Sequence, residues 1–296
     1  MRISAAVAIV FGIVLTVAWA DSQAEEPQAC PRPGTLGVSR VLTIDATGGP
    51  WFGAPHGDKD VLQPGEVVLT FDDGPAPHTT RPILAALAAQ CTKATFFMVG
   101  EMAAEYPNVV HEVAEQGHTI GTHTWSHPNL GRLAEEQAKG QIERAFTAIE
   151  KAAGVNIAPF FRYPYLSESK TAISYLKSRN VAQFAIDIDS FDWRTRSPQA
   201  VVRRVMAGLA HEGRGIILMH DIHASTVGAL PELLSELQAK GYKVVHLQAT
   251  VPAEILPGFE APAKEVQARE AHVRSTHSGR HRYHARRAAS PKAILW

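Results

Sequence analysis

Residues 67–75 read Val-Val-Leu-Thr-Phe-Asp-Asp-Gly-Pro, an apolar run that ends abruptly in two carboxylates and a turn. A continuous run of β-branched and other apolar residues is typical of a strand that is buried on both faces, as in parallel sheets. Gly-Pro after the acids indicates that the chain turns there. The stretch therefore predicts an interior strand with acidic side chains at its carboxyl end.

Apolar strand-like runs and stretches of helical periodicity alternate along most of the chain. Leu230 and Leu234, for example, recur at the spacing of one helix face, and Gly241 follows where a left-handed C-terminal cap is favoured. After a first strand-like run at 41–44, strands are predicted over residues 67–71, 94–99, 118–121, 159–163, 183–188, 215–219 and 243–247, and helices over 81–90, 102–116, 135–153, 169–180, 198–210 and 227–240.

Seven strands that alternate with six helices predict an α/β fold in which helical crossovers join parallel strands. A barrel and a doubly wound open sheet both satisfy this order. No Gly-x-Gly-x-x-Gly follows the strand at 67–71, which weakens the dinucleotide-binding version of the open sheet. In a barrel the chemistry lies at the carboxyl ends of the strands.

The composition indicates a globular protein without a nucleic-acid partner. Of the 296 residues, 45% are hydrophobic, enough for one large or two ordinary domains. Lysine plus arginine and aspartate plus glutamate number 29 each, so the chain as a whole has no basic excess. Residues 271–296 contain six of the basic side chains and no carboxylate, which makes the rest of the chain predominantly acidic.

The N-terminus has the pattern of a secretory signal peptide. Arg2 precedes an apolar run over residues 5–17, and Ala18-Trp19-Ala20 provides a small-x-small cleavage site. The alternative is an uncleaved membrane anchor, but the run is shorter than the about 20 residues that cross a bilayer. We therefore expect an exported protein, periplasmic or secreted.

Two cysteines remain after this leader. In an oxidising compartment, Cys30 and Cys91 are expected to form a disulfide, which would stabilise the fold by about 4 kcal/mol through loop closure. Two unrelated thiols are the alternative.

Acidic and imidazole side chains follow two of the predicted strands. Adjacent Asp72 and Asp73 repel each other, which raises one pKa unless a cation is present, although Asp-Gly-Pro is also favourable turn chemistry. His123 and His127 are four residues apart and are expected on one side of a helical turn, as two ligands of one ion would be. Such pairs arise by chance in a chain with 14 histidines, but this pair follows a strand.

Three further strand ends carry ionisable groups. Arg162 follows the fourth strand, Asp189 and Asp192 the fifth, and His220 the sixth. Alone, the arginine reads more simply as a surface cation and the histidine as a buried core residue. Together they place ionisable side chains on five of seven strand ends, which predicts a single site at that rim.

These motifs together resemble those of the polysaccharide deacetylases of carbohydrate esterase family four. The matching segments are 70–75 (Thr-Phe-Asp-Asp-Gly-Pro), 123–127 (His-Thr-x-x-His), 162–165 (Arg-Tyr-Pro-Tyr), 189–193 (Asp-x-x-Asp-Trp) and 218–220 (Leu-x-His), within residues 65–250. The resemblance implies a distorted (β/α)7 barrel with one catalytic domain. It also implies metal-dependent removal of N-acetyl groups from a chitin-like or peptidoglycan glycan.

The resemblance also implies roles for individual residues. Asp73, His123 and His127 match the metal ligands, Asp72 the catalytic base and His220 the catalytic acid. The ion is expected to be divalent, Zn²⁺ first and Co²⁺ or Ni²⁺ as alternatives.

Further positions match residues that support the reaction. Arg162 holds the base and Asp192 orients the acid. Trp193 and Leu218 wall the acetyl-methyl pocket, and the Tyr165 backbone N–H is the oxyanion donor.

Two further carboxylates match the family's pattern, and one position differs from it. Asp189 and Asp221 match the pattern and are assigned supporting roles only. Leu166 stands where many relatives have glycine, so the loop beyond position 165 is expected to differ in shape. The groove is expected to be shaped by residues 48–56, Trp125 and the 166–168 loop.

Other functions remain open on the sequence alone. An amidohydrolase of small cyclic amides or ureides, an O-acetyl xylan esterase and a non-catalytic carbohydrate-binding barrel share this architecture.

We expect the chain to be divided into a signal peptide over 1–20, a linker over 21–36, a catalytic domain over 37–256 and a basic tail over 257–296. The tail is expected to be a solvated extension or, alternatively, an electrostatic contact with an anionic envelope surface.

Overall fold

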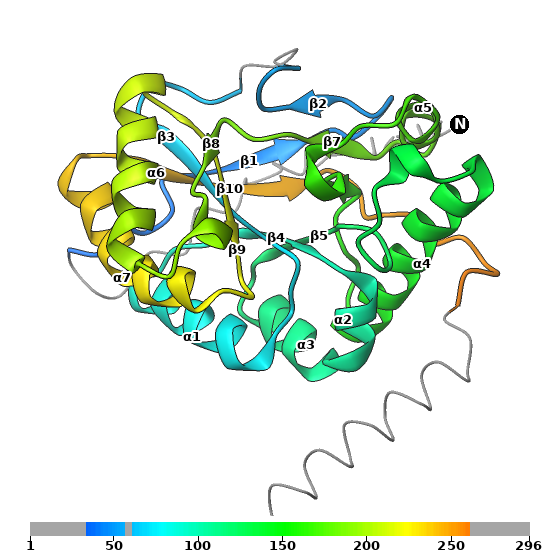
Figure 1. Ribbon diagram of the computed structural model, residues 1–296, viewed down its shortest axis with the longest axis horizontal. Coiled ribbons are helices and arrows are strands. Elements are labelled where there is room, and N and C mark those ends of the chain that lie inside the picture. Colours follow the sequence, from blue (N-terminus) through cyan, green and yellow to red (C-terminus); the bar gives the residue numbers. More distant parts are fainter. Residues whose placement is uncertain (1–33, 57–60, 261–296) are drawn as a thin grey trace, which may run out of the picture.

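The computed structural model describes residues 34–56 and 61–260 of the chain (Figure 1). The predicted signal peptide, most of the linker and nearly all of the basic tail lie outside the described residues. Cys91 is disulfide-bonded, and its predicted partner, Cys30, also lies outside the described residues. Within the described ranges, no helix is long and apolar enough to cross a membrane.

Strands and helices alternate as the sequence predicts. The strands are β1 (Arg40–Ile44), β2 (Trp51–Phe52), β3 (Glu66–Asp72), β4 (Thr95–Met98), β5 (Thr119–Thr122), β6 (Phe160–Phe161), β7 (Ala182–Phe184), β8 (Ile188–Asp189), β9 (Gly215–His220) and β10 (Lys243–Ala249). The helices are α1 (Pro77–Ala89), α2 (Gly100–Glu105), α3 (Pro107–Glu115), α4 (Glu135–Ala153), α5 (Lys170–Ser178), α6 (Pro198–Glu212) and α7 (Ala224–Ala239), with short 3₁₀ turns η1 (Leu130–Arg132), η2 (Pro164–Leu166) and η3 (Asp192–Arg194).

The strands form a distorted parallel barrel, which confirms the predicted α/β fold. Parallel pairs link β9, β3, β4, β5, β6 and β7 in that order, and β8 pairs with β9. In the described part of the chain β7 and β8 are not paired with each other, and residues 185–187 cross the gap between them. In Figure 1 the helices surround the strands on three sides, with α6 and α7 at left, α1 to α3 below and α4 and α5 at right.

Strand β3 is buried on both faces, which explains why its sequence is almost wholly apolar. Val67, Leu69 and Phe71 belong to the large core between the strands and the helices, whereas Val68 belongs to the core inside the barrel with Phe97. All five side chains are at most 1% exposed. Successive side chains of a strand point to opposite faces, so a strand buried on both faces needs a continuous apolar run.

Two predicted elements are each divided in the structure. The helix predicted over 102–116 is two helices, α2 and α3, because Pro107 has no N–H and the preceding Tyr106 leaves the helical region (φ −124°, ψ 55°). The strand predicted over 183–188 is β7 and β8. Its backbone changes partners within four residues, since the Ala185 N–H donates to Phe52 O and the Asp187 N–H donates to Ile216 O.

Candidate active site

The carboxyl end of β3 directs its two aspartates to different partners. Asp72, the last residue of the strand, is 2% exposed and accepts a hydrogen bond from Arg162. Asp73 lies in the left-handed region (φ 76°), and its Oδ1 faces His127 and His123 at 3.2 and 3.5 Å from their Nε2 atoms. This turn therefore gives the adjacent carboxylates separate environments.

The two imidazoles come from a loop after β5, so the expected helical turn is wrong. The loop folds back because Thr124 (φ 67°) and His127 (φ 57°) both take left-handed conformations. The Thr124 hydroxyl accepts the His127 backbone N–H at 3.0 Å and holds the loop closed. The rings of His123 and His127 lie 4.9 Å apart as a result, and both reach Asp73.

The donor atoms of Asp73, His123 and His127 fit a divalent cation. His123 donates its Nδ1–H to the Arg162 carbonyl at 2.8 Å, and burial lowers the pKa of His123 to about 3. Its Nε2 is therefore a lone pair that faces the Asp73 carboxylate. Asp73 Oδ1 is buried and has no hydrogen-bond partner among the described residues. Converging lone pairs repel one another unless a cation lies between them.

The spacing of these donors supports the same conclusion. The three ligand atoms lie within 4.8 Å of one another. Ligands of a tetrahedral zinc ion with bonds of about 2.0–2.1 Å lie about 3.3 Å apart. The measured 3.2 and 3.5 Å are close to that value. The residues that the sequence assigned to the metal therefore come together in a suitable arrangement.

Asp72 is held by a fully buried arginine. The Arg162 Nη1–H groups donate to Asp72 Oδ1 and to Thr70 Oγ1, both at 2.7 Å. The other guanidinium N–H groups donate to the carbonyls of Phe184 and Ala185. Burial raises the pKa of Asp72 above its ordinary value, and the charge of Arg162 opposes that shift. Asp72 is thus a fixed carboxylate with increased proton affinity.

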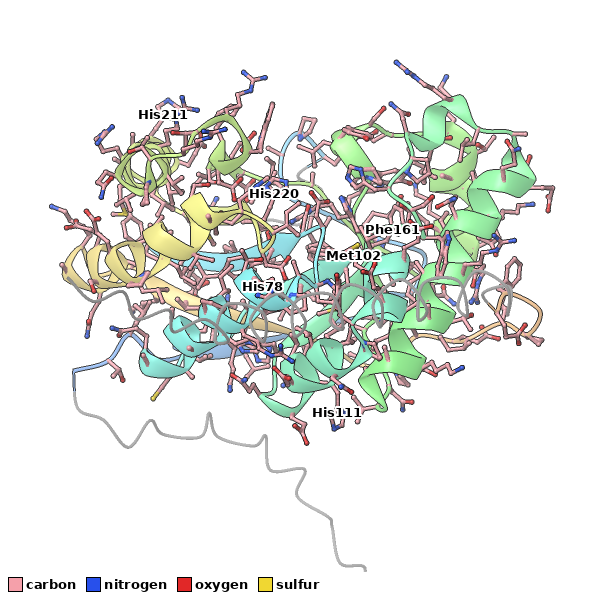
Figure 2. All side chains as sticks on the ribbon, turned by 60° about the horizontal axis from the view of Figure 1, so that its bottom comes forward. His78, Met102, His111, Phe161, His211 and His220 are labelled. Atoms are coloured by element: carbon pink, nitrogen blue, oxygen red, sulfur yellow. The ribbon has the colours of Figure 1, made fainter. Side chains whose placement is uncertain are left out.

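A second carboxylate positions His220 (Figure 2), at the end of β9. Asp192 Oδ1 accepts the His220 Nδ1–H at 2.7 Å, and Asp192 Oδ2 accepts the His220 backbone N–H and the Thr226 hydroxyl. Burial lowers the pKa of His220, but the hydrogen bond and charge of Asp192, with the charges of Asp72 and Asp73, outweigh it and raise the pKa to about 9. Around neutral pH His220 is a cation.

Asp189 and Asp221 lie in different surroundings. Asp189 is half-buried at the end of β8, and its carboxylate accepts the Phe191 N–H at 2.8 Å. Asp221 is buried behind the turn after β3, where Thr80 donates to it at 2.5 Å, and burial raises its pKa to about 7. A Cβ at Gly74 would lie 2.1 Å from Asp221 Oδ2, so this turn requires glycine.

These groups surround a pocket of about 420 Å³. Trp193 is 49% exposed and Tyr165 is 68% exposed, and both line it together with the buried Leu218. Tyr165 and Leu166 both have positive φ (60° and 52°), so Leu166 occupies a conformation that glycine favours and places an apolar side chain on the rim. Trp125 is only 4% exposed and is absent from this pocket's lining, so its expected contribution to the groove is wrong.

Some residues of the site were missed at the sequence level. His223 lines the pocket, and its ring lies 5.5 Å from that of His220. Thr226 and Thr70 are wholly buried: Thr226 donates to the Asp192 carboxylate, and Thr70 accepts a hydrogen bond from Arg162, which holds Asp72. Their position beside strand ends was the available signal, but threonine is common at such places and carries no distinctive pattern.

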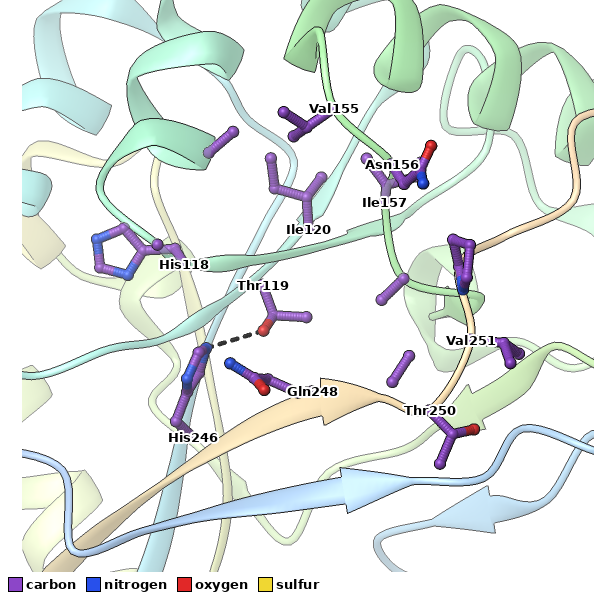
Figure 3. Close-up of a pocket in the computed structure, with 15 residues that line it drawn as sticks. His118, Thr119, Ile120, Val155, Asn156, Ile157, His246, Gln248, Thr250 and Val251 are labelled. Atoms are coloured by element: carbon purple, nitrogen blue, oxygen red, sulfur yellow. Dashed lines mark hydrogen bonds between the residues drawn. The ribbon is translucent and has the colours of Figure 1, made fainter. Parts of the chain in front are cut away.

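A second hollow, of about 410 Å³, lies where β5 begins (Figure 3). His123 follows the opposite end of this strand. Thr119 and His246 meet in the hollow at 2.9 Å, beside His118. Burial lowers the pKa of His118 to about 3 and that of His246 to about 4. Asp72, His220 and the three predicted metal ligands line the first pocket, whereas none of the predicted site residues lines this one.

The chain is similar to several known proteins. A family model described as polysaccharide deacetylase matches residues 59–184. A peptidoglycan-N-acetylglucosamine deacetylase of Bacillus cereus is 35% identical over 187 residues, which cover 62% of this chain and 66% of that protein. A chitooligosaccharide deacetylase of Azorhizobium caulinodans is 30% identical over 190 residues, which cover 60% of this chain and 90% of that protein.

Among solved structures, a peptidoglycan deacetylase of Bdellovibrio bacteriovorus has a TM-score of 0.67 and 33% identity. The similarity covers 76% of this chain and 63% of that one. The chain therefore spans just under two thirds of the Bacillus and Bdellovibrio proteins.

Proposed function

Because the chain belongs to the polysaccharide deacetylase family, we propose that it is a metal-dependent hydrolase that removes N-acetyl groups from an acetylated amino-sugar polysaccharide or oligosaccharide. One observation supports this most strongly: a carboxylate and a cationic histidine flank the three donor atoms. Asp72 Oδ2 lies 3.9 Å from His123 Nε2, and His220 Nε2 lies 4.0 Å from Asp73 Oδ2.

Asp73, His123 and His127 would hold the ion. A bound divalent cation polarises the acetyl carbonyl and increases the acidity of water. Two imidazole nitrogens and one carboxylate oxygen suit Zn²⁺, and Co²⁺ or Ni²⁺ would accept the same set.

Asp72 is the general base of the proposed reaction. It accepts a proton from the attacking water while the water oxygen bonds to the acetyl carbon. Arg162 fixes the carboxylate through Oδ1 and leaves Oδ2 directed towards His123. The raised pKa of Asp72 makes it a better proton acceptor than an exposed aspartate.

His220 is the general acid. The C–N bond breaks as His220 gives its proton to the amine nitrogen, and the products are acetate and a free amino sugar. An amine leaves poorly without this proton. Asp192 keeps His220 charged and fixes the proton on Nδ1, so that Nε2 faces the reaction centre.

The remaining wall of the pocket would position the acetamide. The Tyr165 backbone N–H donates to the developing oxyanion, a contribution of about 3–4 kcal/mol for one such donor. Trp193 and Leu218 enclose the methyl group. Asp189 supports the same side of the site without contacting the reacting atoms.

A substrate panel tests the function. The metal-loaded protein is incubated with chitin oligosaccharides and peptidoglycan glycan, and acetate release is measured with mass spectrometry of the glycan. Acetate release that a chelator abolishes and Zn²⁺ restores supports the proposal. Acetylated xylan and small cyclic amides or ureides serve as comparison substrates. Activity on one of these, with none on acetamido glycans, overturns it.

We also propose that the protein is exported. Cleavage after Ala20 would release the domain outside the cytoplasm, where acetylated glycans occur. The basic residues after 260 would contact an anionic envelope surface. Sequencing the N-terminus of the exported protein tests the cleavage. Fractionation of a chain truncated at residue 260 tests the contact, because an unchanged distribution would exclude it.

A further inference from the structure

A basic surface adjoins the pocket on the side of η3 and α6. Residues 193–211 contain four arginines and neither aspartate nor glutamate, although the folded part of the chain is otherwise rich in acids. All four arginines are exposed (Arg194, Arg196, Arg203 and Arg204). Figure 2 marks this helix by His211, near its end.

Two of these arginines are held next to the pocket by aromatic rings. The guanidinium carbon of Arg194 lies 4.2 Å from the centre of the Trp193 ring, and Trp193 lines the pocket. Arg194 and Arg204 also share the Phe191 ring, at 5.4 and 5.0 Å. The rings bring two cations from different turns of the chain together beside the site. We call Arg194 and Arg204 the arginine pair.

In the described part of the chain the arginine pair forms no close ion pair, although the charge of Arg194 acts on Asp189 and opposes the rise of the Asp189 pKa through burial. By contrast, Arg40, Arg81 and Arg179 each hold a glutamate at 3.0 Å or less. Stacking on a ring leaves the edges of a guanidinium free to donate. Those edges match the two oxygens of a carboxylate.

The charge next to the pocket is uneven. The described residues that line the pocket include no lysine or arginine, and Glu168, which follows Tyr165 and Leu166, is paired with His56. The arginines adjoin only the Trp193 wall. Beyond His220 inside the pocket, the positive charge beside the rim therefore lies on the Trp193 side, at the arginine pair.

We propose that Arg194 and Arg204 form a subsite for a carboxylate on the sugar next to the one whose acetamide enters the pocket. The inference rests on the proposed function, which it deepens. It predicts that the enzyme prefers carboxylated amino-sugar polymers to neutral polymers of the same length.

The test uses substrates that differ only in this carboxylate. One is an oligosaccharide of alternating N-acetylglucosamine and N-acetylmuramic acid, and the other is the same oligosaccharide with each carboxylate converted to a methylamide. The variants are Arg194→Gln, Arg204→Gln and the double variant. Arg203→Gln is the matched control, because it removes the same charge from the same helix and has no contact with Phe191.

The double variant is expected to lose about tenfold in kcat/KM on the carboxylated substrate, mainly through KM, and less than twofold on the methylamide. The preference of the wild-type enzyme for the carboxylated substrate should fall as the salt concentration is raised from 0.05 to 0.5 M, because the Debye screening length shortens to about 4 Å. Equal losses on both substrates, or an equal loss in Arg203→Gln, would overturn the subsite.

Equilibrium binding of both oligosaccharides, measured by calorimetry on the same proteins, separates this inference from the proposed function. Tighter binding of the carboxylated form that the double variant loses supports the subsite even without turnover. Acetate release without any preference in binding or turnover leaves the proposed function intact and overturns the subsite.

Discussion

Replacing Asp192 with asparagine is expected to lower the highest pH at which the enzyme remains active. The pKa of His220 is about 9, against an ordinary 6.5. A difference of about 2.5 units corresponds to about 3.4 kcal/mol in favour of the protonated ring. The hydrogen bond and charge of Asp192 are the largest contributions that raise this pKa. Without them, burial still lowers the pKa and the charges of Asp72 and Asp73 still raise it, so the pKa should fall towards its ordinary 6.5.

The expected loss therefore depends on pH. At pH 8 the protonated fraction of His220 would fall from about 90% to about 3%, a loss of about thirtyfold. At pH 6 the ring is mostly protonated in both proteins, and the loss through this effect is less than twofold. An asparagine oxygen still accepts the Nδ1–H, so the ring keeps its orientation.

Acetate release as a function of pH, together with NMR titration of the His220 ring, measures the effect in the metal-loaded protein. Asp189→Asn is the matched control, because Asp189 also lines the pocket but binds the Phe191 N–H instead of the histidine. A fall in the alkaline pKa confined to Asp192→Asn is the expected result. An unchanged alkaline limb in Asp192→Asn, or an equal shift in the control, would refute the reasoning.

The same shift makes a prediction for stability. A histidine with a raised pKa stabilises the folded state fully below its unfolded pKa of 6.5, and this stabilisation is lost as pH rises through about 9. Asp192→Asn should therefore lower the free energy of unfolding by up to about 3 kcal/mol at pH 6 and by much less at pH 10. Urea denaturation at both pH values measures it.

Three further predictions concern other parts of the fold. Asp72→Asn should retain the metal and lose about 10²–10⁴-fold in kcat, measured by acetate release and metal analysis, and near-full activity would exclude Asp72 as the base. Gly74→Ala should lower the free energy of unfolding in urea by about 1–3 kcal/mol, because its Cβ would overlap Asp221; unchanged stability would contradict that. Because His118 and His246 have lowered pKa values, the free energy of unfolding should fall as the pH drops below 6.5, by up to about 2.7 kcal/mol for each histidine at pH 4.5. In urea titrations, His118→Gln should make the free energy of unfolding less dependent on pH.

The residue types of the candidate site were predictable because each follows a strand. Parallel strands bring their carboxyl ends to one rim, so Asp72, His123 and His220 had to lie near one another once the strands were recognised. Burial then followed from the apolar runs that precede them. What the sequence did not indicate was which oxygen of which carboxylate meets which partner.

The loop of His123 and His127 illustrates that limit. A spacing of four residues suits a helical turn, and nothing in the local sequence excludes one. The structure instead uses left-handed conformations at Thr124 and His127, which cost energy in isolation and persist because the neighbouring contacts enforce them. Those contacts come from β3 and from the Arg162 carbonyl, which are distant in sequence. Local pattern therefore identified side chains that come together in the structure but predicted the wrong backbone conformation.

The divided strand at 183–188 has a functional consequence of the same kind. In a barrel with β7 and β8 fully paired, neighbouring backbone N–H groups would occupy the carbonyls of Phe184 and Ala185. Because the ring is interrupted there, both carbonyls accept hydrogen bonds from the guanidinium of Arg162. A fully buried arginine requires such acceptors, since one carboxylate satisfies only part of its five N–H groups. The interruption in the barrel thus supplies the acceptors that allow Arg162 to hold Asp72 inside the protein, and the distortion of the fold becomes part of the candidate site.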